Sequence, residues 1–327
     1  MNMTTFSRKT VFSLLALGGL MSLAPSAFAQ TGNWPAKPIT FGVPQAPGGA
    51  NDVIARAVAQ GLENSLGQPV IVENRAGANG NLGTGQVARS AGDGYTFLVT
   101  AQSAYTINPA LYSKLPFDPI KDFMPVMQLA VAPYLLVVNP NFPAKNLDEL
   151  VAYAKAHPGK VEYASAGNGT LNHLLGEMLK KQKKIELLHV PYKGAAAAAT
   201  DVVAGQLPMT FGSFPGVMPF VASGKLRVLG VASDKPTTLA PEITPLGKDL
   251  AVTSWYGLFA PAGTPQPVVD KLYQAVRTVL AKPEMAERFK TLGAERVEST
   301  PASFKAMLPA ELAHWKQVVK DSGANID

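Results

Sequence analysis

Short runs of apolar and β-branched residues alternate along this chain with longer segments in which apolar residues recur every three or four positions. The runs predict buried strands, and the segments predict helices that pack one face against a core. Strands are expected at 39–43, 70–72, 96–99, 135–138, 161–164, 189–190, 209–211, 226–231 and 252–260. Helices are expected after 51, 146 and 170, and at 195–204, 215–223, 267–280 and 303–320. Strands that alternate with helices predict an α/β fold with mostly parallel sheets.

The alternation restarts at Leu135, and the strand at 252–260 is expected to run back toward the first unit. Two such units joined by two crossover strands predict two lobes, one of residues 34–133 and 255–327 and one of residues 134–254. Ligands of open α/β sheets bind beyond the carboxyl ends of the strands. A ligand cleft is therefore expected between the lobes.

Residues 1–29 have the pattern of a secretory signal peptide. Arg8 and Lys9 precede an apolar run at 11–23, and the small-residue sequence Ala27-Phe28-Ala29 follows it. This order is typical of an exported chain that is cleaved after Ala29. The apolar run is too short to span a bilayer comfortably, and no later run in the sequence is long and apolar enough to do so.

The composition excludes several classes of site. The chain has no cysteine, which rules out a disulfide, a thiolate metal site and a cysteine nucleophile. Removal of Arg8 and Lys9 with the leader leaves 27 basic and 23 acidic residues, a net charge of +4. The densest basic cluster, at 180–184, falls at a predicted helix end without interleaved aromatic residues, so it predicts a solvated helix cap and no nucleic-acid binding. The four histidines lack metal-ligand spacing, and neither a metal nor a cofactor is expected.

Two neutral glycine loops, 46–52 and 165–170, each follow a predicted strand and precede a predicted helix. A helix N-terminus presents unpaired N–H groups and a partial positive charge, which suits an anion. Neither loop has the lysine of a phosphate-binding P-loop. On the residues alone, a tight turn with Asp52 or Thr170 as helix cap is the commoner role, and His173 is more often a packing or surface residue.

Nine motifs in this order resemble those of the Bug (Bordetella uptake gene) proteins, the periplasmic substrate-binding receptors of tripartite tricarboxylate transporters. They are 34–39 (WPAKPI), 47–52 (PGGAND), 73–83 (ENRAGANGNLG), 93–96 (DGYT), 108–112 (NPALY), 121–125 (KDFMP), 164–170 (ASAGNGT), 190–194 (VPYKG) and 257–265 (GLFAPAGTP). The resemblance implies a two-lobed Venus-flytrap fold in the periplasm. It also implies a monomer without catalytic activity that closes on a small mono-, di- or tricarboxylate, aromatic acids included, and delivers it to membrane permease subunits.

In this family the two glycine loops grip a carboxylate, largely through backbone N–H groups and bridging waters. The ligand-binding residues that the resemblance implies are Gln45, Gly48, Gly49, Ala50, Asp52, Ser103, Ala104, Gly167, Asn168, Gly169, Thr170, His173 and Ser213. Gln45 stands where relatives often carry Phe or Tyr, so it is expected to influence ligand choice. Gly49 is expected to need either close backbone approach or a positive φ.

Two other functions are compatible with the sequence. A ligand-loaded sensor would use the same closure but dock on a periplasmic signalling domain. An exported serine hydrolase would need Ser165 or Ser213 to meet a histidine in space, although Ser213 lies outside the Gly-x-Ser-x-Gly motif. The transport receptor is the interpretation that the motifs favour.

Overall fold

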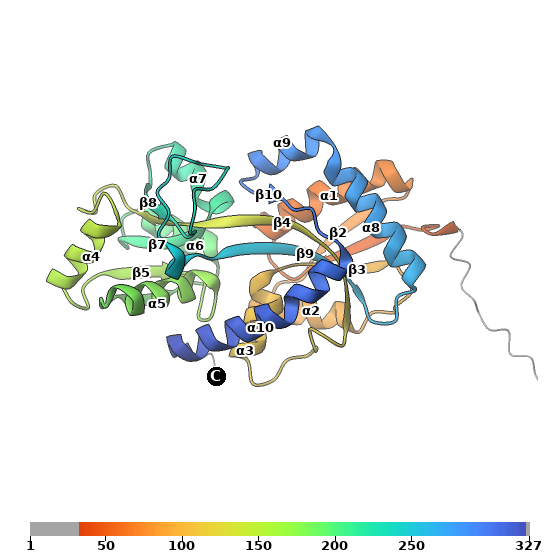
Figure 1. The fold of residues 1–327 in the computed structure, drawn as a ribbon, viewed down its shortest axis with the longest axis horizontal. Coiled ribbons are helices and arrows are strands. Elements are labelled where there is room, and N and C mark those ends of the chain that lie inside the picture. Colours follow the sequence, from red (N-terminus) through yellow and green to blue (C-terminus); the bar gives the residue numbers. More distant parts are fainter. Residues whose placement is uncertain (1–32, 325–327) are drawn as a thin grey trace, which may run out of the picture.

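A computed structural model describes residues 33–324 (Figure 1), so the leader predicted at 1–29 lies outside the described residues. The first elements are β1 (Ile39–Val43), α1 (Ala50–Leu66), β2 (Val70–Asn74), η2 (Ala78–Gly80), α2 (Asn81–Ala88), β3 (Thr96–Ala101), η3 (Ser103–Ile107), α3 (Asn108–Leu111) and β4 (Phe123–Val138). They are followed by α4 (Leu147–Ala156), β5 (Glu162–Ser165), α5 (Leu171–Lys183), β6 (Leu188–Pro191), α6 (Ala195–Val203), β7 (Met209–Ser213), α7 (Phe214–Ala222) and β8 (Arg227–Val231). The last are η4 (Lys248–Leu250), β9 (Thr253–Pro261), α8 (Gln266–Ala281), α9 (Pro283–Thr291), β10 (Glu295–Arg296) and α10 (Pro301–Ser322).

The strands of this range form a ten-stranded sheet with the central order β2-β1-β3-β9-β4-β7-β5-β6, and β8 and β10 each pair with β4. The pairs among β1, β2 and β3 and among β5, β6 and β7 are parallel. The pairs that β4 and β9 form are antiparallel. The predicted α/β fold is therefore confirmed, with a parallel section in each lobe and long antiparallel strands where the lobes join (Figure 1).

Strand β4 runs through both sections of the sheet. Its residues 123–133 pair with β9, and its residues 134–138 pair with β7. The sequence predicted a strand only at 135–138, because Pro125, Gln128 and Pro133 interrupt the apolar pattern upstream. The register against β9 shifts next to Pro125 and again after Gln128, which lets the strand continue past a residue that has no N–H. The predicted lobe boundary at 133/134 falls where β4 changes partners, and the boundaries themselves stay a prediction.

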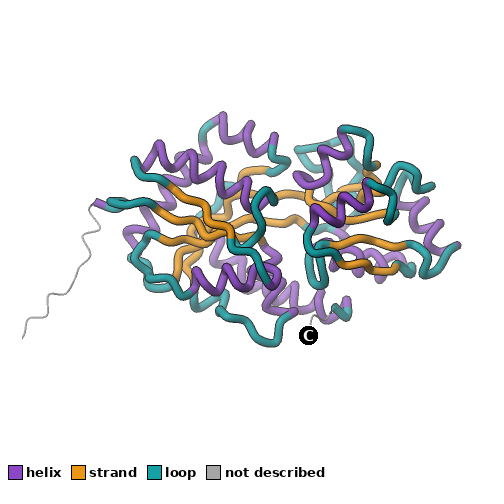
Figure 2. The backbone as a smooth tube through the Cα atoms, turned by 180° about the vertical axis from the view of Figure 1, so that it is seen from behind, coloured by secondary structure: helices purple, strands orange, loops and turns teal. Residues whose placement is uncertain are grey.

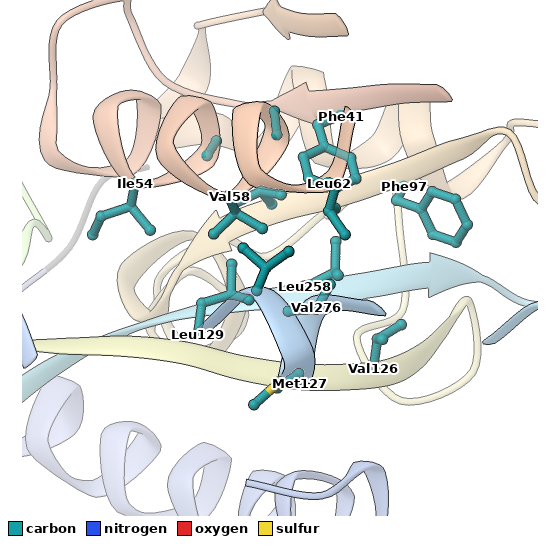
Figure 3. Close-up of a cluster of buried hydrophobic side chains, with 14 of the residues drawn as sticks. Phe41, Ile54, Val58, Leu62, Phe97, Val126, Met127, Leu129, Leu258 and Val276 are labelled. Carbon is teal, nitrogen blue, oxygen red and sulfur yellow. The ribbon is translucent and has the colours of Figure 1, made fainter. Parts of the chain in front are cut away.

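Helices cover both faces of the first section. Phe97 and Val99 of β3 belong to a core with α1, α8 and α9, which also contains Phe41 and Val276 (Figure 3). Leu98, between them, belongs to a second core on the opposite face. Successive residues of a strand point to opposite faces, so this division follows from the strand geometry.

Helix α10 packs on both lobes. Phe304 and Leu308, in its first half, join the second core of the first section. Trp315 and Val319, in its second half, join the core that α4 and α5 form on the other section. The predicted assignment of all of 255–327 to one lobe does not anticipate this double contact.

Candidate ligand-binding site

The two glycine loops join parallel strands to the helices that follow them, β1 to α1 in one lobe and β5 to α5 in the other. Figure 2 shows the strands of the two lobes as separate groups with loops lying between them. Asn79, in the turn before α2, donates a hydrogen bond from Nδ2 to the carbonyl oxygen of Asn168, in the second glycine loop, at 3.2 Å. A side chain added at Gly80 would come within 3.2 Å of Nε2 of Gln45, just before the first glycine loop. The turn at 77–80 therefore connects the two segments that carry the predicted loops.

The first loop is held by Asp52, which is 3% exposed. Oδ2 of Asp52 accepts hydrogen bonds from the N–H of Gly48 at 2.9 Å and from Nε of Arg56 at 3.1 Å, and Oδ1 accepts one from Nδ2 of Asn74 at 2.9 Å. Burial by itself would raise the pKa of Asp52, but these hydrogen bonds and the Arg56 charge together lower that pKa below its ordinary value. The carboxylate is therefore occupied by the loop and its neighbours, so a contribution of Asp52 to binding would come through the shape of the loop.

The positive φ of the first loop lies at Gly48 and not at Gly49. Gly48 has φ +79°, whereas Gly49, the N-cap residue of α1, has φ −73° and ψ 165°. A Cβ added at Gly49 would meet the carbonyl oxygen of Ala46 at 3.5 Å, an ordinary contact distance. The expectation of a positive φ at Gly49 was therefore wrong.

A pair of alanine substitutions separates these two glycines. We expect Gly48→Ala to lower the free energy of unfolding by about 1 kcal/mol, because an L side chain is strained in the left-handed region. Gly49→Ala should leave that free energy nearly unchanged. Urea unfolding of both variants measures the difference, and equal stabilities would contradict the loop geometry.

Asn51 connects the first loop to the end of β3. Its Nδ2 donates hydrogen bonds to Oε1 of Gln45 and to the carbonyl oxygen of Val99. Its Oδ1 has no hydrogen-bond partner in the described part of the chain, although Asn51 is 3% exposed. A buried acceptor without a partner costs about 1–3 kcal/mol, so this oxygen is a candidate to receive a hydrogen bond from a ligand or water. Asn51 was not predicted as a site residue, because its position in the sequence indicates only the start of a helix.

The segment after β3 supports the turn at 77–80. Ala104 is fully buried beneath Gly80, where an added Cβ would approach it to 3.0 Å. Tyr105 is also buried and stacks on Phe259, with ring centroids 4.1 Å apart. Ser103 begins η3 and is partly exposed. Of the predicted pair Ser103 and Ala104, Ser103 is the one whose side chain is open to a ligand.

The second loop is closed by bonds inside the protein. Gly167 and Gly169 have φ +127° and +74°. The Thr170 hydroxyl donates to the carbonyl oxygen of Gly167 at 2.7 Å and does not cap α5. The N–H of Gly167 donates to Oγ of Ser165 at 3.1 Å, and the N–H of Gly169 donates to Nδ1 of His173 at 3.0 Å. The two glycines therefore shape the loop, and their own N–H groups are engaged within it.

The structure brings Ser165 and His189 together, with 2.6 Å between Oγ and Nε2. Ser165 has no exposed surface, and its Oγ is also bonded to Gly167. A nucleophile must reach a substrate, so this pair does not support the hydrolase. His189 comes from β6 and was not singled out from the sequence. Ser213, the other candidate serine, is the N-cap residue of α7 and pairs with Tyr134 where the lobes join.

Open backbone N–H groups remain at the starts of α1 and α5. The first N–H groups of a helix have no intrahelical acceptor, and neither helix has a side-chain cap. Asn146 and Thr300 cap α4 and α10, whereas α2, α6, α7, α8 and α9 also lack a side-chain cap, so the position of α1 and α5 after the glycine loops is what distinguishes them. The first-turn residues of the two open helices are Ala50, Asn51 and Asp52 in α1 and Leu171, Asn172 and His173 in α5. Leu171 and Asn172 were not predicted as site residues, because any residue except proline supplies a backbone N–H and the residue type therefore gives no signal.

A cavity of about 510 Å³ lies away from both loops, between β4, α8 and the start of α10. Arg277 and Arg296 line it, but Thr300 and Ser303 cap the adjacent helix start reciprocally. Its helix start therefore lacks the open donors of the glycine loops.

Within residues 33–324, no cluster of three or more acidic, histidine or cysteine side chains could hold a metal ion. No helix in that range is long and apolar enough to span a membrane.

Comparison with known proteins identifies the family of this chain. The family model "Tripartite tricarboxylate transporter family receptor" matches residues 54–324. Protein BugT of Bordetella pertussis is 34% identical over 298 residues, which are 90% of this chain and 91% of that protein. The solved structure of R. palustris Rpa4515 with adipate is 30% identical with a TM-score of 0.85, covering 90% of this chain and 100% of that one. MatC (Rpa3494) from Rhodopseudomonas palustris with bound malate is 31% identical with a TM-score of 0.80, covering 88% and 100%. The chain therefore belongs to the tripartite tricarboxylate transporter receptor family, that of the Bug proteins, whose members are periplasmic solute-binding proteins and not enzymes.

Proposed function

We propose that this receptor is exported, cleaved after Ala29, and binds a small organic carboxylate between its two glycine loops in the periplasm. It then delivers the carboxylate to the membrane subunits of a tricarboxylate-type transporter. The observation that carries the proposal is the pair of uncapped helix starts, α1 and α5, that follow the two glycine loops. The similar proteins solved with adipate and malate support the ligand class.

Two effects attract a carboxylate to each helix start. The helix dipole contributes about 0.3–1 kcal/mol, and each hydrogen bond to a charged group contributes about 1.5–3 kcal/mol. Arg56, the cation beside the first loop, is already paired with Asp52 at 3.0 Å. The site therefore neutralises an anion through backbone N–H groups, which keeps the ligand releasable.

The proposed contacts come from both lobes. In the first lobe they are the N–H groups of Gly49, Ala50 and Asn51, with Gln45 and Ser103 beside them. In the second lobe they are the N–H groups of Asn168, Leu171 and Asn172. A ligand that contacts both lobes binds the closed arrangement more tightly than the open one. It shifts the equilibrium toward the closed arrangement by the difference between its two binding free energies.

A thermal-shift screen tests the proposal. Adipate and malate, together with other mono-, di- and tricarboxylates including aromatic ones, are compared with their neutral amides. A bound acid should stabilise the receptor by about 2.7 kcal/mol at a concentration 100 times its Kd, whereas the matched amide should have no effect. Equal effects of acid and amide, or no effect of any carboxylate, would contradict the proposal.

The delivery step needs its own experiment. Receptor loaded with its acid should co-purify with the transporter's membrane subunits from solubilised membranes, and the ligand-free receptor should do so less. Retention of a periplasmic signalling domain instead would favour the sensor.

A further inference from the structure

The second glycine loop, residues 165–170, is hydrogen-bonded to the side chains of His173 and His189. Neither side chain is among the proposed ligand contacts. We propose that the imidazole pair, His173 and His189, positions this loop for carboxylate binding only while both rings are uncharged, so that acid weakens the receptor's hold on its ligand. The inference rests on the proposed function of the loop. The two histidines are positioning residues, because each acts through a residue of the loop.

His173 holds one end of the loop. Its Nδ1 accepts the N–H of Gly169 at 3.0 Å, so the proton of the neutral ring is on Nε2. A second proton could add only at Nδ1, where it would point at the N–H of Gly169. Protonation of His173 at Nδ1 would therefore replace the hydrogen bond with two N–H groups that point at each other. Gly169 would be released, and with it the bond that holds its φ at +74°.

His189 holds the other end through Ser165. Oγ of Ser165 accepts the N–H of Gly167 at 3.1 Å and lies 2.6 Å from Nε2 of His189. The Ser165 hydroxyl can donate to a neutral His189 or to the carbonyl oxygen of Gly167, which lies 3.1 Å away. That oxygen already accepts the Thr170 hydroxyl at 2.7 Å and the Thr170 N–H at 3.3 Å, so the Ser165 proton is best donated to His189. Charging His189 removes the nitrogen acceptor and leaves the Ser165 proton only this crowded oxygen.

The two rings are coupled by stacking. Their centroids are 4.0 Å apart and their planes differ by 16°. Two positive charges at this separation repel each other, and more strongly in partly buried surroundings than in water. The first ring to become charged therefore opposes the charging of the second.

The surrounding titratable groups offset this repulsion only in part. Those that face the pair are Tyr163 of β5 and Glu177 and Lys180 of α5. Glu177 lies 3.9 Å from Nε2 of His173, but it also accepts the Tyr163 hydroxyl at 2.7 Å and pairs with Lys180 at 2.8 Å. The negative charge of Glu177 is therefore shared between Tyr163, Lys180 and His173, which reduces its effect on the histidine pair.

These surroundings favour neutral rings. Burial lowers the pKa of His173, and Lys180 lowers it further against the opposing effect of Glu177. Burial, followed by the charge of His173, lowers the pKa of His189 to about 4. Both rings have a pKa of about 6.5 when exposed. The ordered loop is therefore favoured above about pH 6.5, and this advantage is lost as the pH falls from there toward 4.

The first test measures the pH dependence of affinity for adipate or malate, whichever stabilises the receptor. A single ring whose pKa falls from about 6.5 in the released loop to about 4 in the ordered loop sets the upper limit of the loss, about twentyfold between pH 7 and pH 5. The loss is smaller to the extent that the loop of the ligand-free receptor is already ordered. The double variant His173→Asn, His189→Gln keeps an acceptor oxygen near each ring nitrogen but cannot be charged. Its affinity at pH 7 is its own reference, and the ratio of its Kd at pH 5 to its Kd at pH 7 should lack the loss seen in the wild type. Protonation of the ligand affects both proteins equally and cancels in the comparison.

A removal variant completes the binding series. His173→Leu lacks the acceptor for Gly169, so it should bind more weakly even at pH 7, and His173→Asn should restore that affinity. Equal pH dependence in the wild type and the double variant would overturn the inference while leaving the proposed function intact. A receptor that binds no carboxylate at pH 7 would instead contradict the proposed function.

A second test needs no ligand. NMR of the imidazole nitrogens in the free receptor should show both rings neutral at pH 6, with the His173 proton on Nε2. The amide signal of Gly169 should then shift as His173 titrates at lower pH. A His173 proton on Nδ1, or a charged ring at pH 6, would overturn the positioning role whatever the ligand is.

Discussion

Replacing Ala50 with proline is expected to weaken carboxylate binding by about ten- to a hundredfold while the fold stays intact. Ala50 is the first residue of α1, where proline removes an N–H without removing an intrahelical hydrogen bond. Gly49 has φ −73° and ψ 165°, a region that a residue before proline adopts readily. A hydrogen bond to a charged group contributes about 1.5–3 kcal/mol, and about 1.4 kcal/mol is tenfold in affinity. Isothermal titration calorimetry with adipate or malate measures the change in Kd.

Ala50→Gly is the matched control, because it alters the same side chain but keeps the N–H. It should bind with nearly the wild-type Kd. Pro283 and Pro301 already begin α9 and α10, so this fold accepts proline at a first helical position. Wild-type affinity in Ala50→Pro would exclude the N–H of Ala50 as a ligand contact.

Asp52→Asn is expected to lower the free energy of unfolding by about 1–3 kcal/mol and the carboxylate affinity by more than tenfold. An amide nitrogen in place of either carboxylate oxygen would point at donors, either Gly48 and Arg56 or Asn74 and Arg56. With the nitrogen toward Gly48, the loop loses the bond that holds Gly48 in its left-handed conformation. With the nitrogen turned the other way that bond remains, but Asn74 and Arg56 each lose an acceptor. Urea unfolding and titration calorimetry on the same preparation measure the two effects.

The lowered pKa of Asp52 adds a pH dependence to this prediction. Its stabilising effect is present above the ordinary aspartate pKa of about 3.9 and is lost as the pH falls below that value. Asp52→Asn should therefore lack this part of the acid destabilisation. Arg56→Ala is the control, since Arg56 is half-exposed and the Gly48 bond survives its removal. Arg56→Ala should lower the free energy of unfolding by less than about 1 kcal/mol. If Arg56→Ala and Asp52→Asn lowered it equally, the role of Asp52 in the loop would be contradicted.

Elements with strong local periodicity were predicted well from the sequence. The strand at 39–43 matches β1, and the helix expected at 195–204 corresponds to α6 (Ala195–Val203). The long first part of β4 was missed, because its prolines and bulges break the alternation on which the prediction depends. Helix α9 was missed as well, since Met285 and Phe289 are its buried side chains and form too short an apolar pattern.

The positions of the two glycine loops were predicted, and the predicted ligand-binding residues include Gly49, Ala50 and Asn168, whose N–H groups stay in the proposal. The N–H groups of Gly48, Gly167 and Gly169 were expected to be open in the same way. Side chains of Asp52, Ser165 and His173 take up these groups instead. The open donors are then those of the first helical turns, which no side-chain pattern marks.

By itself, the sequence determined the α/β class, the lack of any cysteine site and the family, because these depend on local periodicity, composition and ordered motifs. Only the tertiary structure decided that Asn79 meets Asn168, that Ser165 meets His189 and that α10 packs on both lobes. The physical reason is that periodicity records which face of an element is buried but not which distant element covers it. A site made of backbone donors from two lobes depends on that second kind of information.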